Sequence, residues 1–121
     1  MGKLRRKKVG SRQVLILYQA SLLAQGVESL LRKERGLDVV GLQLGSGPRG
    51  GHVEGLDPDV IILDTCDLGG RAGMTVLGLL QAHPRAKVIC LNAEDDKLEV
   101  YRRHERVAAR REELVEAIRS N

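Results

Sequence analysis

Asp64 is the residue of this sequence whose position best suits chemistry. It follows four consecutive branched apolar residues, 60 to 63, and such a run is typical of a strand covered on both faces in a parallel sheet. Pro58 stands before the run, and proline is tolerated at the start of a strand but not inside one. The carboxyl ends of the strands border the ligand crevice of an open α/β sheet, so Asp64 is a candidate functional carboxylate. The alternative is structural, because an aspartate after a strand also caps the next loop or helix.

The other chemically capable residues lie apart from one another. The two cysteines, Cys66 and Cys90, are too few and too scattered for a metal cage or a disulfide scaffold. Cys90 stands inside an apolar run, which indicates a small buried hydrophobe, and nothing beside Cys66 indicates a reactive thiol. The glycine-rich segment 45–55 matches neither the dinucleotide nor the Walker phosphate-binding pattern. With no nucleophile–base pair, metal-ligand cluster or cofactor fingerprint, the sequence predicts no enzyme, no catalytic residue, no metal site and no cofactor.

Strands and helices alternate along the chain. Apolar runs predict strands over residues 14–17, 37–44, 60–63 and 87–91, the second with the partial alternation of a sheet edge. Apolar residues at helical spacing predict a helix from Leu22 that Gly36 ends, a second helix that stops before Pro84, and a last helix over residues 111–119. The side chains expected to face the core are Leu22, Leu23, Val27, Leu30 and Leu31 in the first helix, Met74, Val76, Leu77, Leu79 and Leu80 in the second, and Leu114, Val115 and Ile118 in the last. This order, with the loop at 45–55 in place of a helix, predicts a mostly parallel sheet with right-handed crossovers.

Residues 97–109 allow two interpretations. They contain no Gly or Pro and are rich in Arg and Glu, which suits one long helix. The alternation of Leu98 and Val100 with Glu99 and Tyr101 favours a hairpin instead, with a second strand that includes residues 106–108. The arginines at 102, 103, 106, 110 and 111 form either a basic face or, since glutamates interleave with them, a solvated surface.

Length and charge limit the class of protein. The 121 residues suffice for one domain with a core, and the expected division is a tail over residues 1–12 and a single domain over residues 13–121. The net charge is +4, but Lys3, Arg5, Arg6, Lys7 and Lys8 of the tail carry five positive charges, so the rest of the chain has a net charge of −1. Such a tail is either a disordered, solvated terminus or a contact for nucleic acid or an acidic membrane surface. No apolar run approaches the roughly 18 residues of a membrane span and no secretory signal is apparent, so a cytoplasmic protein is expected.

The order of elements and the strand ends resemble the receiver domains of two-component response regulators. The resemblance covers about residues 13–96 and again the terminal helix. Its closest part is the segment Leu-Asp-Pro-Asp-Val-Ile-Ile-Leu-Asp at 56–64, with further similarity at 14–23, 36–41 and 88–96. The resemblance implies a flavodoxin-like, receiver-like three-layer α/β fold with strand order 2-1-3-4-5. In this fold the glycine-rich loop replaces the second helix, and a terminal β-hairpin is one option.

The resemblance also implies what each pocket residue corresponds to. Asp64 falls on the phosphoacceptor aspartate, whereas Tyr18 and Gln19 fall on the acidic pair that holds Mg²⁺ in the family. Asn92 falls on the Thr or Ser that binds the phosphoryl group, Thr65 is nearby, and no Lys occupies the family's remaining position. Mg²⁺ requires hard oxygen ligands, usually carboxylates, so Mg²⁺ binding is not expected. Phosphoryl transfer depends on positioning and on charge neutralisation, so little catalysis is left without the metal site and the lysine.

The expected function is that of a non-catalytic pseudo-receiver, a protein-interaction or regulatory module in signalling that does not depend on phosphorylation. An exposed fifth strand is expected to offer an edge for a homodimer. Two alternatives stay open: an atypical receiver still phosphorylated or ligated at Asp64, and a nucleic-acid-binding protein that uses the basic tail. Only Tyr18 and Tyr101 are aromatic, so no stacking platform for single-stranded nucleic acid is expected.

Overall fold

The computed structural model describes residues 12–18, 22–43, 57–64, 72–92, 94, 97–102 and 105–119, with the backbone alone at 72–75 and 105–107. Several features expected from the sequence lie outside these residues. They are the basic tail before Arg12, the glycine-rich loop at 45–55, and the side chains of Gln19, Thr65 and Cys66.

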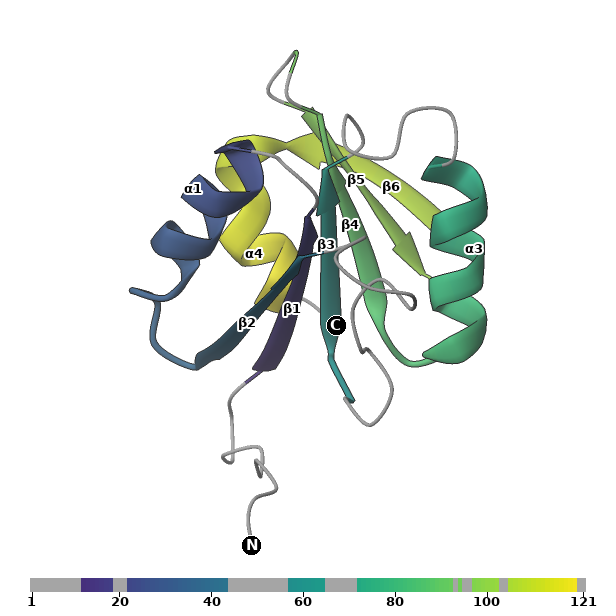
Figure 1. The fold of residues 1–121 in the computed structure, drawn as a ribbon. Helices are drawn as coiled ribbons and strands as arrows, with labels where there is room; N and C mark the ends of the chain where they lie inside the picture. Colours follow the sequence, from purple (N-terminus) through teal and green to yellow (C-terminus); the bar gives the residue numbers. More distant parts are fainter. Residues whose placement is uncertain are drawn as a thin grey trace, which may run out of the picture.

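A single mixed sheet of six strands forms the centre of the described structure, in the order β2-β1-β3-β4-β5-β6 (Figure 1). The strands are β1 (Arg12–Tyr18), β2 (Leu37–Gln43), β3 (Val60–Asp64), β4 (Lys87–Leu91), β5 (Lys97–Arg102) and β6 (Glu105–Arg110). The first four strands are parallel to one another, whereas β5 runs antiparallel to both β4 and β6. The four predicted parallel strands are therefore present, and the first five strands follow the predicted order.

Helices cover both faces of the sheet. Helix α1 (Leu22–Leu31) and helix α4 (Leu114–Arg119) lie on one face, and α3 (Ala72–Ala82) lies on the other (Figure 1). A short 3₁₀ turn, Arg111–Glu113, leads from β6 into α4. Because successive side chains of a strand point to opposite faces, each of the strands β1 to β5 supplies both cores. Val60 and Ile62 face α1 and α4, whereas Ile61 and Leu63 face α3.

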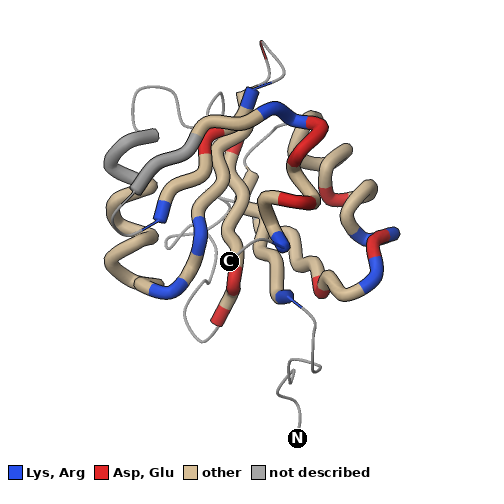
Figure 2. Tube along the Cα trace, turned by 180° about the vertical axis from the view of Figure 1, so that it is seen from behind, with Lys and Arg blue, Asp and Glu red and all other residues tan. Residues whose placement is uncertain are grey.

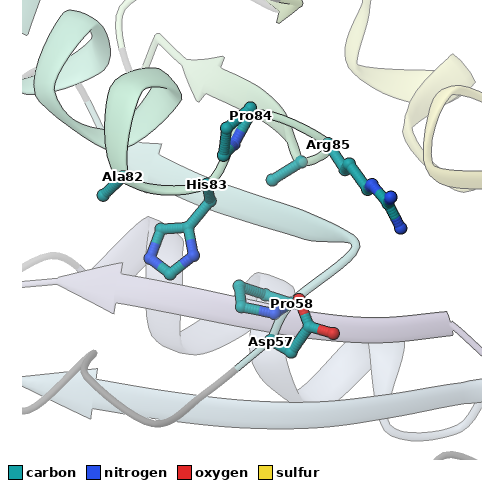
Figure 3. A pocket seen from close by; sticks show the side chains of 7 residues that line it. Asp57, Pro58, Ala82, His83, Pro84 and Arg85 are labelled. Atoms are coloured by element: carbon teal, nitrogen blue, oxygen red, sulfur yellow. The ribbon is translucent and has the colours of Figure 1, made fainter.

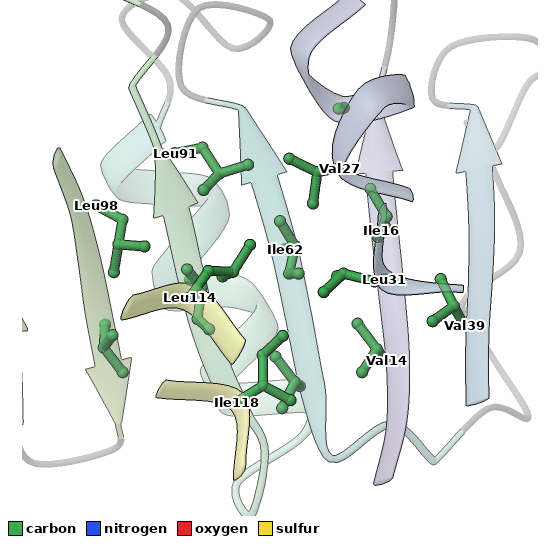
Figure 4. Packing of buried hydrophobic residues seen from close by; sticks show 14 residues of the cluster. Val14, Ile16, Val27, Leu31, Val39, Ile62, Leu91, Leu98, Leu114 and Ile118 are labelled. Atoms are coloured by element: carbon green, nitrogen blue, oxygen red, sulfur yellow. The ribbon is translucent and has the colours of Figure 1, made fainter. Parts of the chain in front are cut away.

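Among the described residues, more buried side chains lie between the sheet and the pair α1 and α4 than on the α3 side; Figure 4 shows the α1 and α4 side. Strand residues such as Ile16, Ile62 and Leu91 pack there against Val27 and Leu31 of α1. Helix α4 contributes Leu114 and Ile118, which are 3% and 0% exposed, as predicted, while Val115 is partly buried. The short last helix therefore completes one face of the molecule.

The hairpin interpretation of residues 97–109 is confirmed, because β5 and β6 pair in antiparallel register from Lys97 with Arg110 to Arg102 with Glu105. The expectation of an exposed fifth strand is wrong. Strand β5 pairs with β4 on one side and β6 on the other, so the edges of the described sheet are β2 and β6. The prediction that residues 37–44 form a sheet edge is confirmed by β2.

Three leucines predicted to face the core are exposed instead: Leu22 by 82%, Leu30 by 54% and Leu77 by 57%. A helix on a sheet buries one stripe of its surface, and in α1 this stripe is taken by Ala24, Val27 and Leu31. Apolar residue type alone therefore overestimated the buried face.

Two boundaries also differ from the predicted ones. Tyr18 belongs to β1 and not to the following loop, since it pairs with Gln43 of β2. Helix α1 ends at Leu31, before Gly36. Gly36 instead has a φ of 80°, a left-handed conformation that glycine adopts readily, and it turns the chain into β2.

No helix in the described part of the chain is long and apolar enough to cross a membrane.

Candidate functional site

The carboxyl ends of β1, β3 and β4 lie side by side and form one border of the sheet, called here the carboxyl-end edge to distinguish it from the edge strands β2 and β6. This edge brings three of the predicted site residues together. Tyr18 is the last residue of β1, Asp64 is the last residue of β3, and Asn92 follows β4 directly. The strand register places Leu17 beside Leu63 and Asp64 beside Leu91. Tyr18, Asp64 and Asn92 thus stand at the ends of neighbouring strands, while Gln19 and Thr65 lie outside the described residues.

Asp64 is buried, with only 2% of its surface exposed. Strand alternation directs its side chain toward the face covered by α1 and α4, since Ile62 packs there and Leu63 packs on the other face. Tyr18 is partly buried against the same core. A carboxylate enclosed in this way is shielded from solvent, which restricts the access of any reagent to its oxygen atoms.

Asn92 uses its polar atoms to shape the turn after β4. Its side-chain Oδ1 accepts a hydrogen bond of 2.9 Å from the backbone N–H of Glu94, the arrangement by which an Asx residue stabilises a turn. Its backbone carbonyl accepts a hydrogen bond of 3.0 Å from Nη2 of Arg111. The Asn92 side chain is thus a structural acceptor in this conformation.

Arg111 is a residue of this edge that the sequence did not single out as part of the site. It follows β6, and because β6 is parallel to β4, the two strands end at the same edge as β3. The guanidinium therefore approaches the chain one residue after Leu91, the neighbour of Asp64. The sequence does place Arg111 directly after the hairpin. Only the direction of β6 shows that this position lies at the same edge as Asp64.

A second polar cluster, which the sequence did not reveal, lies around Lys87. Lys87 is the first residue of β4, so the cluster is at the opposite, amino-end edge of the parallel strands. Lys87 is 6% exposed, and its Nζ donates hydrogen bonds to the backbone carbonyls of Ala117 and Ile118 at the end of α4, the latter at 3.4 Å. Burial, together with the positive charges of Arg102 and Arg12, lowers the pKa of Lys87 from 10.5 to about 8. The positive charge of a lysine at the last carbonyls of a helix also interacts favourably with the helix dipole.

Two arginines extend this cluster across the first and last elements of the domain. Nη2 of Arg12 donates to the carbonyl of Arg119 at 3.0 Å. Nη2 of Arg119 in turn donates to the carbonyl of Arg35 at 2.8 Å and lies 3.5 Å from Oε1 of Glu34. These contacts join the carboxyl end of α4 to β1 and to the turn after α1.

Two of the arginines considered as a basic face, Arg102 and Arg110, do not lie together, and the side chain of Arg106 is outside the described residues. Arg102 and Arg110 stand at opposite ends of the β5–β6 hairpin, since Arg102 pairs with Glu105 and Arg110 with Lys97. Seen from behind, the described chain carries acidic and basic residues in alternation and not in one basic stripe (Figure 2). The solvated-surface interpretation fits this distribution better, and Arg103 lies outside the described residues.

A pocket of about 380 Å³ opens at the amino ends of β3 and β4, away from Asp64. It is lined by Asp57 and Pro58 before β3 and by residues 82–86 between α3 and β4, and the imidazole of His83 points toward Pro58 (Figure 3). Among the described residues, no group of three or more His, Cys, Asp or Glu side chains is placed to hold a metal ion. The pocket combines one carboxylate, one imidazole and Arg85, which is a set without a clear ligand.

Cys90 lies in the core on the α3 side and is 4% exposed. Burial, with a smaller contribution from Glu99, raises the pKa of its thiol from 9.0 to about 12. The prediction that Cys90 is a small buried hydrophobe is confirmed.

No family model, no curated protein and no solved structure matches this chain.

Proposed function

We propose that the chain is a pseudo-receiver, a protein-interaction module of a signalling system whose action does not depend on phosphorylation. The proposal rests on the receiver-like order 2-1-3-4-5 of the first five strands and on the position of Asp64 at the end of β3. In receivers this position holds the phosphoacceptor. The chain shares the order of its first five strands with a receiver but departs from the family in the residues and strand direction that the switch needs.

The observation that carries the proposal is the enclosure of Asp64. Its carboxylate belongs to a residue that is only 2% exposed, and Tyr18 stands at the end of the neighbouring strand where receivers have an acidic residue. Phosphoryl transfer needs an accessible acceptor oxygen and nearby charges that neutralise the transferred group. Asp64 is too enclosed to offer an accessible acceptor oxygen, so in this proposal it acts as a buried structural residue and the function lies in surface contacts.

The direction of β5 supports the same conclusion. In receivers a lysine after the fifth strand reaches the phosphoryl site, which requires the fifth strand to end at the same edge as the third. Here β5 is antiparallel to β4, so it ends with Arg102 at the opposite edge, beside Lys87. The cationic contact of the family is thus missing from its usual strand.

An amide NMR spectrum with and without Mg²⁺ and beryllofluoride, a mimic of an aspartyl phosphate, tests the proposal. The expected result is that the amides of Asp64, Leu91 and Asn92 do not shift. The matched control is Asp64→Asn, which keeps the size of the side chain and removes its charge. If the mimic shifts the wild-type amides at Asp64 and Asn92 but leaves the variant unchanged, the pseudo-receiver proposal is wrong.

One observation favours a second candidate, an atypical receiver that is still phosphorylated or ligated at Asp64. Arg111 brings a guanidinium to this edge through its hydrogen bond to the carbonyl of Asn92. An arginine binds phosphoryl oxygens in a bidentate manner, so it would replace the family's lysine. The candidate requires that a small phosphodonor adds one phosphoryl mass to the wild type and none to Asp64→Asn.

A further inference from the structure

Strand β2 forms the less protected of the two edges of the described sheet. Its sequence, Leu-Asp-Val-Val-Gly-Leu-Gln, contains one charged residue in seven positions, Asp38, and no proline. The other edge, β6, has the sequence Glu-Arg-Val-Ala-Ala-Arg, with three charged residues in six positions. Charged residues and prolines are the usual means by which an edge strand avoids pairing with another chain. Strand β2 therefore has the character of a pairing edge.

The hydrogen bonds of β1 determine which backbone groups of β2 face outward. The N–H of Arg12 donates to the carbonyl of Gly36 at 2.7 Å, and Arg12 is the register partner of Leu37. In a parallel ladder this pattern turns the even-numbered residues of β2 toward β1. The N–H and C=O groups of Leu37, Val39, Gly41 and Gln43 consequently point to the edge, where, in the described structure, β2 has no second neighbouring strand.

From this edge we infer that two copies of the chain associate through β2, as antiparallel strands related by a twofold axis beside Val40. The register centred on Val40 places Leu37 opposite Gln43 and Val39 opposite Gly41 of the second copy. All four outward-facing residues then form hydrogen-bonded pairs, which gives a continuous sheet across the dimer. The inference deepens the proposed function, since it rests on the chain being an interaction module and names the partner of one of its surfaces.

Charge allows this register. Asp38 lies opposite Leu42 of the second copy, so no like charges meet along the strand. Above β2, the carboxylate of Glu28 lies over Gly41 and accepts a hydrogen bond of 3.2 Å from Nε of Arg32 in the same helix. In each copy, the ion pair of Glu28 and Arg32 therefore adds no net charge beside the contact between the two β2 strands. A partner with a net charge of +4 would be repelled at a basic surface but not at this edge.

The size of the contact indicates a weak dimer. Seven strand residues extend for about 24 Å and exchange about eight backbone hydrogen bonds in this register. Such a contact is at the low end of interface sizes, so a dissociation constant on the order of 10 μM is expected.

Hydrogen exchange of the unmodified chain provides the first test, because its readout is specific to individual β2 amides. At about 5 μM the amides of Val39 and Gly41 should exchange rapidly, while those of Val40 and Leu42, bonded to β1, should be protected. At about 500 μM the amides of Val39 and Gly41 should become protected as well. Rapid exchange of both at every concentration, or protection that does not depend on concentration, would overturn the inference.

Two variants of one residue test the register. Leu42→Lys places an ammonium opposite Asp38 of the second copy, whereas Leu42→Glu places a second carboxylate there. Each dimer contains two such pairs, so sedimentation velocity should show a dissociation constant about fivefold lower for Leu42→Lys and about fivefold higher for Leu42→Glu. Simple repulsion between chains of charge +4 predicts the opposite ranking, because Lys raises this charge and Glu lowers it.

The matched control is Ala108→Lys, which adds the same charge in the middle of the exposed edge strand β6. It should raise the dissociation constant no more than its added charge requires, and it should leave the exchange of Val39 and Gly41 concentration-dependent. If Leu42→Lys weakens the dimer as much as Ala108→Lys or more, the β2 register is wrong. A monomeric chain that still gives no shift with beryllofluoride would overturn the dimer and leave the proposed function intact.

Discussion

At the scale of single residues, Lys87 is where burial and charge conflict most clearly. Its pKa is lowered from 10.5 to about 8, first by burial and then by Arg102 and Arg12. Between these two pH values the unfolded chain binds a proton at Lys87 that the folded chain does not bind. Stability therefore rises with pH across this window, and the cost of the buried charge is fully present below about pH 8.

Replacing Lys87 with Met should abolish this pH dependence. We expect the free energy of unfolding of the wild type, relative to that of Lys87→Met, to increase by about 1–3 kcal/mol between pH 7.5 and 10.5. Urea denaturation at several pH values measures the difference, and the contribution of Cys90 cancels because both proteins contain it. The exposed Lys97 offers the control, since Lys97→Met should parallel the wild type. A difference between wild type and Lys87→Met that stays flat with pH would mean that the Lys87 ammonium is adequately solvated.

Cys90 gives a second prediction at this scale. In a Cys66→Ser chain the remaining thiol should react with a thiol reagent at pH 8 about a thousandfold more slowly than in the denatured chain. The expected ratio follows from the rise of its pKa from 9.0 to about 12, since the thiolate is the reactive form. Ellman's reagent with and without denaturant measures the ratio. Comparable rates in both states would show that the core around Cys90 opens readily.

At the scale of elements, α1 and β2 meet where the carboxylate of Glu28 lies over Gly41. A Cβ at this position would lie 2.5 Å from Oε1 of Glu28. In the wild type, Gly41→Ala should therefore gain less than the about 0.5–1 kcal/mol by which alanine is favoured over glycine inside a strand, because Glu28 must move away and weaken its contact with Arg32. In a Glu28→Ala chain the same substitution should give the full gain, since no carboxylate then has to move. A double-mutant cycle at equilibrium unfolding measures the coupling, and additive effects of the two substitutions would contradict this account.

Helix α4 has six residues, and so short a helix is not stable by itself. It is held by the burial of Leu114 and Ile118 and by the contacts of Lys87 and Arg12 with its last carbonyls. Ile118→Ala should cost about 3 kcal/mol of unfolding free energy, because it leaves a cavity at a site with no exposure. The partly buried Val115 is the matched control and should cost about 1 kcal/mol when changed to Ala. Equal, small losses at both sites in chemical denaturation would mean that α4 is loosely docked.

The elements were largely predictable because β1, β3 and β4 contain continuous apolar runs and β2 alternates in part. The antiparallel direction of β5 also had a signal, since only five residues separate Leu91 from Lys97. A parallel connection needs a dozen or more residues, so this spacing permits only a hairpin. The exposure of Leu22 and Leu30 was not predictable, because their type suits a core and only the orientation of α1 on the sheet decides which side chains are buried.

The candidate site was predictable only where it follows from strand ends. Asp64 and Asn92 meet at one edge because parallel strands end together. Arg111 and Lys87 were missed because their contacts join residues 19 and 30 or more positions apart in the chain. Such contacts depend on the direction of β6 and on where α4 docks, which no local pattern encodes.

At the scale of the whole molecule, charge is divided between the first residues and the folded part. The chain carries a net charge of +4. Five positive charges come from Lys3, Arg5, Arg6, Lys7 and Lys8, so the rest of the chain has a net charge of −1. Within the described residues, Arg102 lies near the amino end of β4, whereas Arg111 lies near its carboxyl end. Over the residues that the structure describes, a duplex would therefore meet no continuous basic surface.

Any affinity of the chain for nucleic acid should consequently reside in its first eight residues. We expect the full chain to bind a DNA duplex weakly and without sequence preference. Its affinity should fall at least about tenfold between about 50 and 200 mM salt, because the release of counterions from the DNA is less favourable in more concentrated salt. A chain that starts at Val9 should show no binding in fluorescence anisotropy at either salt concentration. Binding by the shortened chain that persists at the higher salt concentration would contradict the proposed interaction module and favour a nucleic-acid-binding protein. Loss of binding with unchanged concentration dependence at β2 would assign electrostatic contact to the tail and self-association to the sheet edge.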